Sequence, residues 1–132
     1  MRLTADTNVL VRAAVDDDPE QAALARAQLQ GADSVALTTR TLCELVWVLS
    51  QGYKIKSADI AAQIRLFVCA ANAATDAQAV TVGLAALDAG GDFADAVIAF
   101  EGRRLGADEF VSFDRRAVAL LKKQGVAARL LT

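Results

Sequence analysis

The chain has 132 residues, a formal net charge of −2 and no histidine. This length predicts a single domain, residues 1–132, with one hydrophobic core. Because histidine is absent, Ser-His-Asp and Cys-His catalysis, histidine zinc sites and histidine general bases are excluded, which leaves carboxylates, hydroxyls and hard cations for catalysis. The net charge provides no overall attraction for nucleic acid, so any nucleic-acid role depends on local basic clusters or bound metal.

The N-terminus and the cysteines indicate a cytoplasmic protein. The first residues do not form a signal peptide, and no apolar run reaches the length that spans a membrane. Cys43 and Cys69 lie in apolar helical segments without the spacing of a metal site. We therefore expect reduced, buried thiols and no disulfide.

The residue pattern predicts short strands that alternate with helices. The expected strands are Arg2–Ala5, Val35–Thr38, Glu109–Phe113 and Ala127–Leu131. The expected helices are Asn8–Val15, Glu20–Gln30, Thr39–Gln51, Ser57–Ala71, Asp76–Ala89, Asp92–Leu105 and Arg115–Lys123. Thr7 is a candidate cap for the first helix, and the helix from Thr39 is apolar nearly all round, which predicts that it is buried.

This order of elements predicts an α/β fold with a short, mostly parallel sheet flanked by helices on both faces. Ligands of such sheets lie beyond the carboxyl ends of the strands. Asp6 and Asp114 each stand at that end of a predicted strand. The topology therefore favours a functional role for both residues.

Four acidic residues occur in segments that otherwise read as core: Asp6, Glu44, Asp95 and Asp114. A carboxylate in apolar surroundings is costly unless it is paired, protonated or bound to a cation. If the fold brings the four together, they repel one another, and a divalent cation would offset that repulsion. The pattern therefore favours an all-carboxylate metal site.

Three of these acids also have a structural alternative. Asp6 and Asp114 precede predicted helices, so each is a candidate N-cap. Glu44 lies four residues after Arg40, and an i,i+4 ion pair is the alternative there, partly dry because its neighbours are apolar. The alternatives remain open for all three.

Asp92 and Asp95 lie three residues apart and share a face of the predicted helix. Asp92 is the more natural cap. Asp95 continues into a row with Ile98, Ala99 and Gly102 that is apolar and expected to point inward. Asp95 is therefore the better ligand candidate, and Asp92 is a helper.

Polar and basic residues near these acids are candidates for supporting roles. Asn8 is placed either to orient Asp6 or to cap the helix, and the Ser112 hydroxyl either holds a water or makes a strand-end hydrogen bond. Arg115 and Arg116 directly follow Asp114 and are the best candidates for contacts with substrate phosphate. The acidic run 16–18 precedes a proline and is expected to be a solvated loop without chemistry.

Four segments carry a family resemblance. They are Ala5-Asp6-Thr7-Asn8-Val9-Leu10, Glu44 in its helix, Asp92-Phe93-Ala94-Asp95-Ala96-Val97-Ile98-Ala99, and Val111-Ser112-Phe113-Asp114-Arg115. In their order, spacing and total length, the whole chain resembles the PIN-domain ribonuclease family, and within it the VapC-type toxins of type II toxin–antitoxin systems. The last segment has serine where threonine is commoner, which keeps the hydroxyl.

The resemblance implies a three-layer α/β domain and a Mg²⁺- or Mn²⁺-dependent endoribonuclease. It also implies an RNA substrate, a homodimer and a small cognate antitoxin that neutralises the toxin. By this resemblance the catalytic acids are Asp6, Glu44, Asp95 and Asp114, with Asp6 and Asp95 as direct magnesium ligands. Asn8 and Ser112 match polar positions that support them.

Three other functions fit parts of the pattern. A catalytically silent PIN-like binding module would have the same fold without activity. A phospho-acceptor receiver domain would need an acceptor aspartate after a mid-chain strand and a late lysine after a strand, whereas Glu44 and Lys122 lie in predicted helices. A haloacid-dehalogenase-type phosphatase would need a second aspartate where Asn8 stands.

Overall fold

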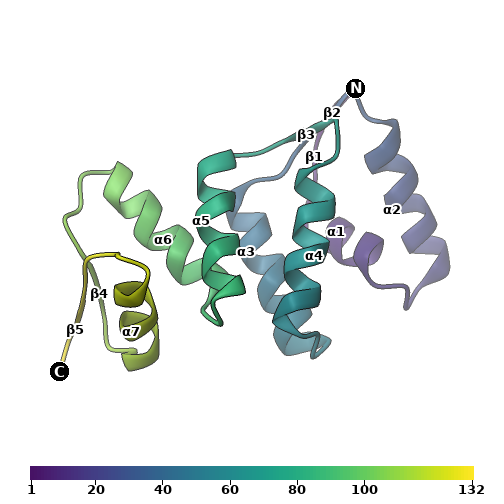
Figure 1. Ribbon diagram of the computed structural model, residues 1–132. Helices are drawn as coiled ribbons and strands as arrows, with labels where there is room; N and C mark the ends of the chain where they lie inside the picture. Colours follow the sequence, from purple (N-terminus) through teal and green to yellow (C-terminus); the bar gives the residue numbers. More distant parts are fainter. The chain divides into compact units, whose positions relative to one another are not determined.

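The computed structural model describes residues 1–132, and the chain folds as two compact units, Met1–Asp76 and Ala77–Thr132 (Figure 1). Short parallel strands and longer helices make up both units, which confirms the predicted α/β class with parallel strands. None of the helices combines the length and apolar character that a membrane crossing requires.

The first unit carries a three-stranded parallel sheet in the order β1-β2-β3. Leu3 of β1 lies opposite Val35 of β2, which lies opposite Ala73 of β3. The elements of this unit are β1 (Arg2–Thr4), α1 (Thr7–Ala14), α2 (Pro19–Gly31), β2 (Ser34–Ala36), α3 (Thr39–Trp47), the π-helical turn η1 (Val48–Gly52), α4 (Ser57–Val68) and β3 (Ala73–Ala74).

The second unit pairs two parallel strands, β4 and β5, with Phe110 opposite Ala128. Its elements are α5 (Ala77–Asp88), α6 (Phe93–Arg104), β4 (Phe110–Ser112), α7 (Arg115–Lys123) and β5 (Ala128–Leu130). A core of small and branched side chains joins helices to strands: Ala86, Ala96, Val118, Leu121 and Ala128.

Helices α5 and α6 approach each other closely at Gly83. A Cβ atom built there would lie 2.5 Å from the ring of Phe93, a side chain with no exposed surface. Only glycine leaves room for that ring, so Gly83 fixes the position of the first turn of α6. The candidate acids of this unit lie in or beside that turn.

Several structural details differ from the predictions. Asp6, not Thr7, is the N-cap of α1. The predicted helix from Thr39 ends as an α-helix at Trp47 and continues as the π-helical turn, and Trp47 is 66% exposed rather than buried. The strand β3 was not predicted. Neither cysteine is in a disulfide, but Cys43 is half-buried and Cys69 is exposed, whereas both were expected to be buried.

Candidate active site

Asp6 lies at the junction between β1 and α1. Its Oδ1 accepts a hydrogen bond of 2.7 Å from the backbone N–H of Thr7, so the carboxylate caps the helix. Capping satisfies one of the free N–H groups of the first turn and sets the carboxylate at the carboxyl end of β1. Asp6 is exposed there, in the position expected for a ligand-binding residue of a parallel sheet.

Glu44 lies on α3 and accepts two charge-assisted hydrogen bonds. The Thr7 hydroxyl donates to Oε2 at 2.7 Å, and Arg40 Nε donates to Oε1 at 3.0 Å. Both donors favour the ionised form, so the hydrogen bond from Thr7, followed by that from Arg40, lowers the pKa of Glu44. The predicted i,i+4 ion pair with Arg40 is present, but the side chain is 48% exposed, so the expected dry environment is wrong.

Thr7 connects the two acids of the first unit. Its backbone N–H binds Asp6 and its hydroxyl binds Glu44, and it is the one polar residue among the buried residues. A buried hydroxyl with a charged partner holds that partner in a single orientation. Thr7 was predicted only as a helix cap, and this bridge was missed because its partner Glu44 lies 37 residues away, where no local pattern signals the contact.

Asp92 and Asp95 lie at the start of α6. Asp92 Oδ1 accepts a 3.1 Å hydrogen bond from the Asp95 backbone N–H, so Asp92 is the N-cap, as predicted. Burial, and then the negative charges of Asp92 and Asp114, raise the pKa of Asp95. The charge of Asp95 is therefore uncompensated, in contrast to that of Glu44.

The predicted inward row after Asp95 is wrong at Ile98, whereas Ala99 packs against the core cluster. The buried residues of α6 are Phe93, Ala96 and Val97, whereas Ile98 is 56% exposed. Helical geometry places Asp95 and Ile98 outside that buried stripe. Asp95 is therefore partly buried, at the edge of the packed face.

Asp114 lies at the carboxyl end of β4. Its Oδ1 accepts a 3.1 Å hydrogen bond from the Ala117 backbone N–H and caps α7, while the Ser112 hydroxyl accepts a 3.0 Å hydrogen bond from the Asp114 backbone N–H. The capping and strand-end alternatives therefore both occur. They leave the Asp114 carboxylate exposed and fix its backbone.

The remaining candidates are exposed. Asn8 lies in the first turn of α1, where Thr7 rather than Asn8 donates to Asp6. Arg116 Nη2 donates to the Gly90 carbonyl at 3.2 Å, whereas no such bond holds the exposed guanidinium of Arg115. Arg115 is therefore the freer of the two cations beside Asp114.

Residues of the acidic run 16–18 make defined contacts with neighbouring helices. Asp17 accepts hydrogen bonds from Arg12 at 3.0 Å and from the Tyr53 hydroxyl at 2.9 Å, and the bond from Tyr53 is the main cause of a lowered pKa of Asp17. Asp18 caps α2 through the Gln21 backbone N–H. These residues connect α1 to the segment after η1, which is a structural role.

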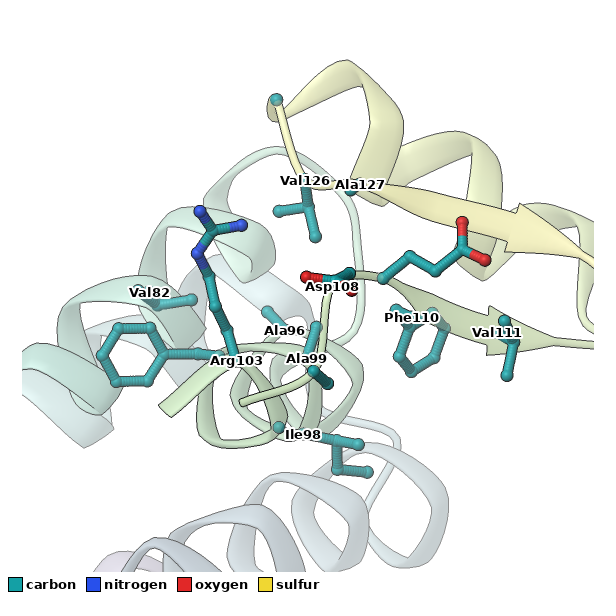
Figure 2. A pocket seen from close by; sticks show the side chains of 15 residues that line it. Val82, Ala96, Ile98, Ala99, Arg103, Asp108, Phe110, Val111, Val126 and Ala127 are labelled. Carbon is teal, nitrogen blue, oxygen red and sulfur yellow. The ribbon is translucent and has the colours of Figure 1, made fainter. Parts of the chain in front are cut away.

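A cavity of about 520 Å³ in the second unit lies away from the acids. It is lined by α6, by the segments that precede β4 and β5, and by Phe110 and Val111 of β4, with Arg103 and Asp108 beside it (Figure 2). Asp92, Asp95 and Asp114 do not line it. The cavity lies toward the amino end of β4, whereas Asp114 follows its carboxyl end.

The donor set of each unit suits a hard divalent cation. Carboxylate and hydroxyl oxygens are the ligands that Mg²⁺ and Mn²⁺ prefer, and the charges crowded around Asp95 are of the kind that a cation relieves. Within neither unit do three or more His, Cys, Asp and Glu side chains form a group that could hold a metal ion.

Comparison with known families assigns the chain. The PIN domain model matches residues 4–123, a segment that includes Asp6, Glu44, Asp95 and Asp114. Comparison with curated proteins gives no match. PIN domains have a nuclease-type fold and are generally metal-dependent nucleases. The predicted family is thereby confirmed, and the chain belongs to the PIN domain family.

Proposed function

We propose that this PIN-domain protein is a Mg²⁺- or Mn²⁺-dependent endoribonuclease that acts as the toxin of a toxin–antitoxin pair. The observation that carries the proposal is the electrostatics of Asp95, whose pKa is raised by burial and by the charges of Asp92 and Asp114. Such crowding is unfavourable in a merely structural site and favourable where a divalent cation binds.

The acids have separate roles in this proposal. Asp6 and Asp95 are the direct metal ligands, and Glu44 and Asp114 complete the catalytic set. A bound divalent cation would lower the pKa of a water molecule and stabilise charge on the phosphate. Thr7 holds the Glu44 carboxylate in one orientation through its 2.7 Å hydrogen bond.

Supporting roles follow from the contacts of the second unit. Asp92 and Ser112 hold the backbone of Asp95 and Asp114, respectively, through hydrogen bonds of 3.1 and 3.0 Å. Arg115 contacts substrate phosphate, and Arg116, which is tied to a carbonyl, adds positive charge beside it. Asn8 supports Asp6 from the first turn of α1.

We also propose that residues 1–132 act as one functional domain. The family match runs without interruption through the boundary between the two units at residues 76 and 77, which supports this proposal. A cytoplasmic homodimer is the expected form. The exposed edge of α3, with Glu44 and the 66% exposed Trp47, is a candidate surface for a protein partner.

The proposed antitoxin would act through the same carboxylates. An arginine or lysine of the partner would pair with them and compete with metal and phosphate, while apolar side chains would fill a groove between helices. Expression of the protein alone should then arrest growth, and co-expression of the neighbouring small open reading frame should relieve the arrest. Unaffected growth with folded wild-type protein would contradict the toxin role.

The nuclease proposal is tested by cleavage of single-stranded and loop RNA. Mg²⁺ or Mn²⁺ should support cleavage, chelator should stop it, and Asp6→Asn, Glu44→Gln, Asp95→Asn and Asp114→Asn should each remove most activity in folded protein. Asp59→Asn is a matched control, because Asp59 is an exposed acid in the first turn of α4. Folded wild type that cleaves no RNA would instead favour the silent binding module.

A further inference from the structure

One aromatic residue of the second unit is exposed and directly precedes a candidate acid in the chain. Phe113 follows β4, directly precedes Asp114 and is 78% exposed. The other three phenylalanines of this unit are engaged: Phe93 is buried against Gly83, Phe100 lies under the Arg104 guanidinium at 4.4 Å, and Phe110 packs against the core cluster. Phe113 therefore has no equivalent packing role.

The surroundings of Phe113 point to a nucleic-acid ligand. The backbone next to the ring is fixed, since Asp114 donates its N–H to Ser112 and caps α7. Arg115, two residues further on, presents an exposed guanidinium that no ion pair holds. An exposed aromatic residue that is followed in the chain by a candidate catalytic acid and a free cation supplies groups suited to the base, the scissile bond and the phosphate of a nucleotide.

Electrostatics explains why such a contact is needed. The chain has a net charge of −2, and the candidate site is itself acidic, so long-range attraction for RNA is absent. Short-range contacts must then contribute to binding beside local cations and bound metal, and base stacking on an aromatic ring is one that does not depend on charge. A stacked base also positions the neighbouring phosphate.

We infer that Phe113 is a stacking platform for an unpaired RNA base next to the cleaved phosphodiester, with Arg115 contacting the adjoining phosphate. This inference rests on the proposed ribonuclease function and adds a residue that contacts the substrate through a splayed base. Phe113 is a positioning residue in this arrangement. Its ring contacts the base, and the acids act on the phosphate.

The test separates stacking from apolar contact. Phe113→Leu should raise KM for single-stranded RNA by about tenfold and leave kcat unchanged, whereas Phe113→Trp should keep the wild-type KM. Leu105→Ala is the matched control, because Leu105 is an 89% exposed apolar residue of the same unit. Equal KM values for Phe113→Leu and wild type would overturn the inference.

An abasic substrate locates the contact. A series of RNAs is made, each lacking one base. At one position next to the cut, removal of the base should raise the KM of wild type by the same factor as Phe113→Leu raises KM on the complete RNA. On that abasic RNA the two proteins should have the same KM. If the KM of Phe113→Leu exceeds that of wild type by the same factor on every abasic RNA, the ring does not contact a base.

The oligomeric state is a second check. If the substitution turns a dimer into a monomer, the ring belongs to an interface between copies, and the RNA assignment is overturned.

Binding distinguishes failure of this inference from failure of the nuclease proposal. The probe is a single-stranded 2′-O-methyl oligonucleotide with one 2-aminopurine, measured with Ca²⁺ in place of Mg²⁺. If wild type quenches the fluorescence of the 2-aminopurine and Phe113→Leu does not, the result supports stacking even if wild type cleaves no RNA. Binding without any change in Phe113→Leu, or no binding at all, contradicts it.

Discussion

The acids of the two units differ in how their charge is compensated. In the first unit Glu44 receives hydrogen bonds from Thr7 and Arg40, and its pKa is lowered; in the second unit Asp95 lies among Asp92, Asp114 and apolar surface, and its pKa is raised. The first carboxylate is already stabilised by the protein. The second is destabilised by its surroundings, and we expect it to respond most strongly to the proposed cation.

The largest expected effect is on catalysis in the second unit. Asp95→Asn should lower kcat by about a thousandfold, because it removes the charge that the proposed cation needs and changes little else. Single-turnover cleavage of RNA in Mg²⁺ measures it. Wild-type rates for Asp95→Asn, in protein with a normal circular dichroism spectrum, would show that Asp95 has no catalytic role.

A smaller effect on kcat is expected when Glu44, in the first unit, loses its hydrogen bond from Thr7. Thr7→Val removes the hydroxyl that holds Glu44, so kcat should fall by about tenfold and Tm by about 4 °C. Thr7→Ser keeps the hydroxyl and should restore most of both. If Thr7→Val lowers Tm while the rate of cleavage stays at the wild-type value, the bridge is structural only.

Metal-free stability should change in opposite directions in the two units. Asp95→Asn removes a destabilised carboxylate and should raise Tm by about 2 °C, a modest value because solvent screens a partly exposed group. Glu44→Gln removes a stabilised carboxylate and should lower Tm. Differential scanning calorimetry in chelator checks both signs, and a fall in Tm for Asp95→Asn would contradict the comparison.

The smallest expected effect is the pH dependence of the metal-free stability differences between wild type and the two variants, Glu44→Gln and Asp95→Asn. Since the folded-state pKa of Glu44 is lowered, its contribution to stability is present above its unfolded pKa and is lost as pH falls through the folded pKa. Since the folded-state pKa of Asp95 is raised, its contribution is present below its unfolded pKa and is lost as pH rises through the folded pKa.

Metal-free melting curves from acid to neutral pH should therefore show two gaps of opposite sign. The gap for Glu44→Gln should open as pH rises toward the unfolded pKa of about 4 and stay constant above it, whereas the gap for Asp95→Asn should open above about pH 4. Wild type should become more stable than Glu44→Gln and less stable than Asp95→Asn as pH rises. Gaps of the same sign would mean that the two carboxylates have similar environments.

The sequence predicted the elements whose signals are local. The helix Arg115–Lys123 has both predicted ends, because Asp114 caps it and Gly125, at φ 80°, follows it. The four predicted strands are each present but shorter. The strand Ala73–Ala74 was missed because alanine has low β-propensity and the pairing partner, β2, is distant in sequence.

The candidate site was predictable in its residues but not in its contacts. Asp92 as a cap and the ion pair between Arg40 and Glu44 follow from spacings of three and four residues. The hydrogen bond from Thr7 to Glu44 spans 37 residues, and no local pattern encodes it. The exposure of Ile98 depends on which face of α6 packs on α5, which is a tertiary choice.

The most direct test of the account is the melting temperature of wild type and Asp95→Asn as a function of Mg²⁺ concentration. A cation that binds only the folded protein raises Tm with its concentration. We expect Mg²⁺ at millimolar levels to raise Tm of wild type and to leave Asp95→Asn nearly unchanged. No effect of Mg²⁺ or Mn²⁺ on wild type, or an equal rise in both proteins, would contradict a metal site at Asp95.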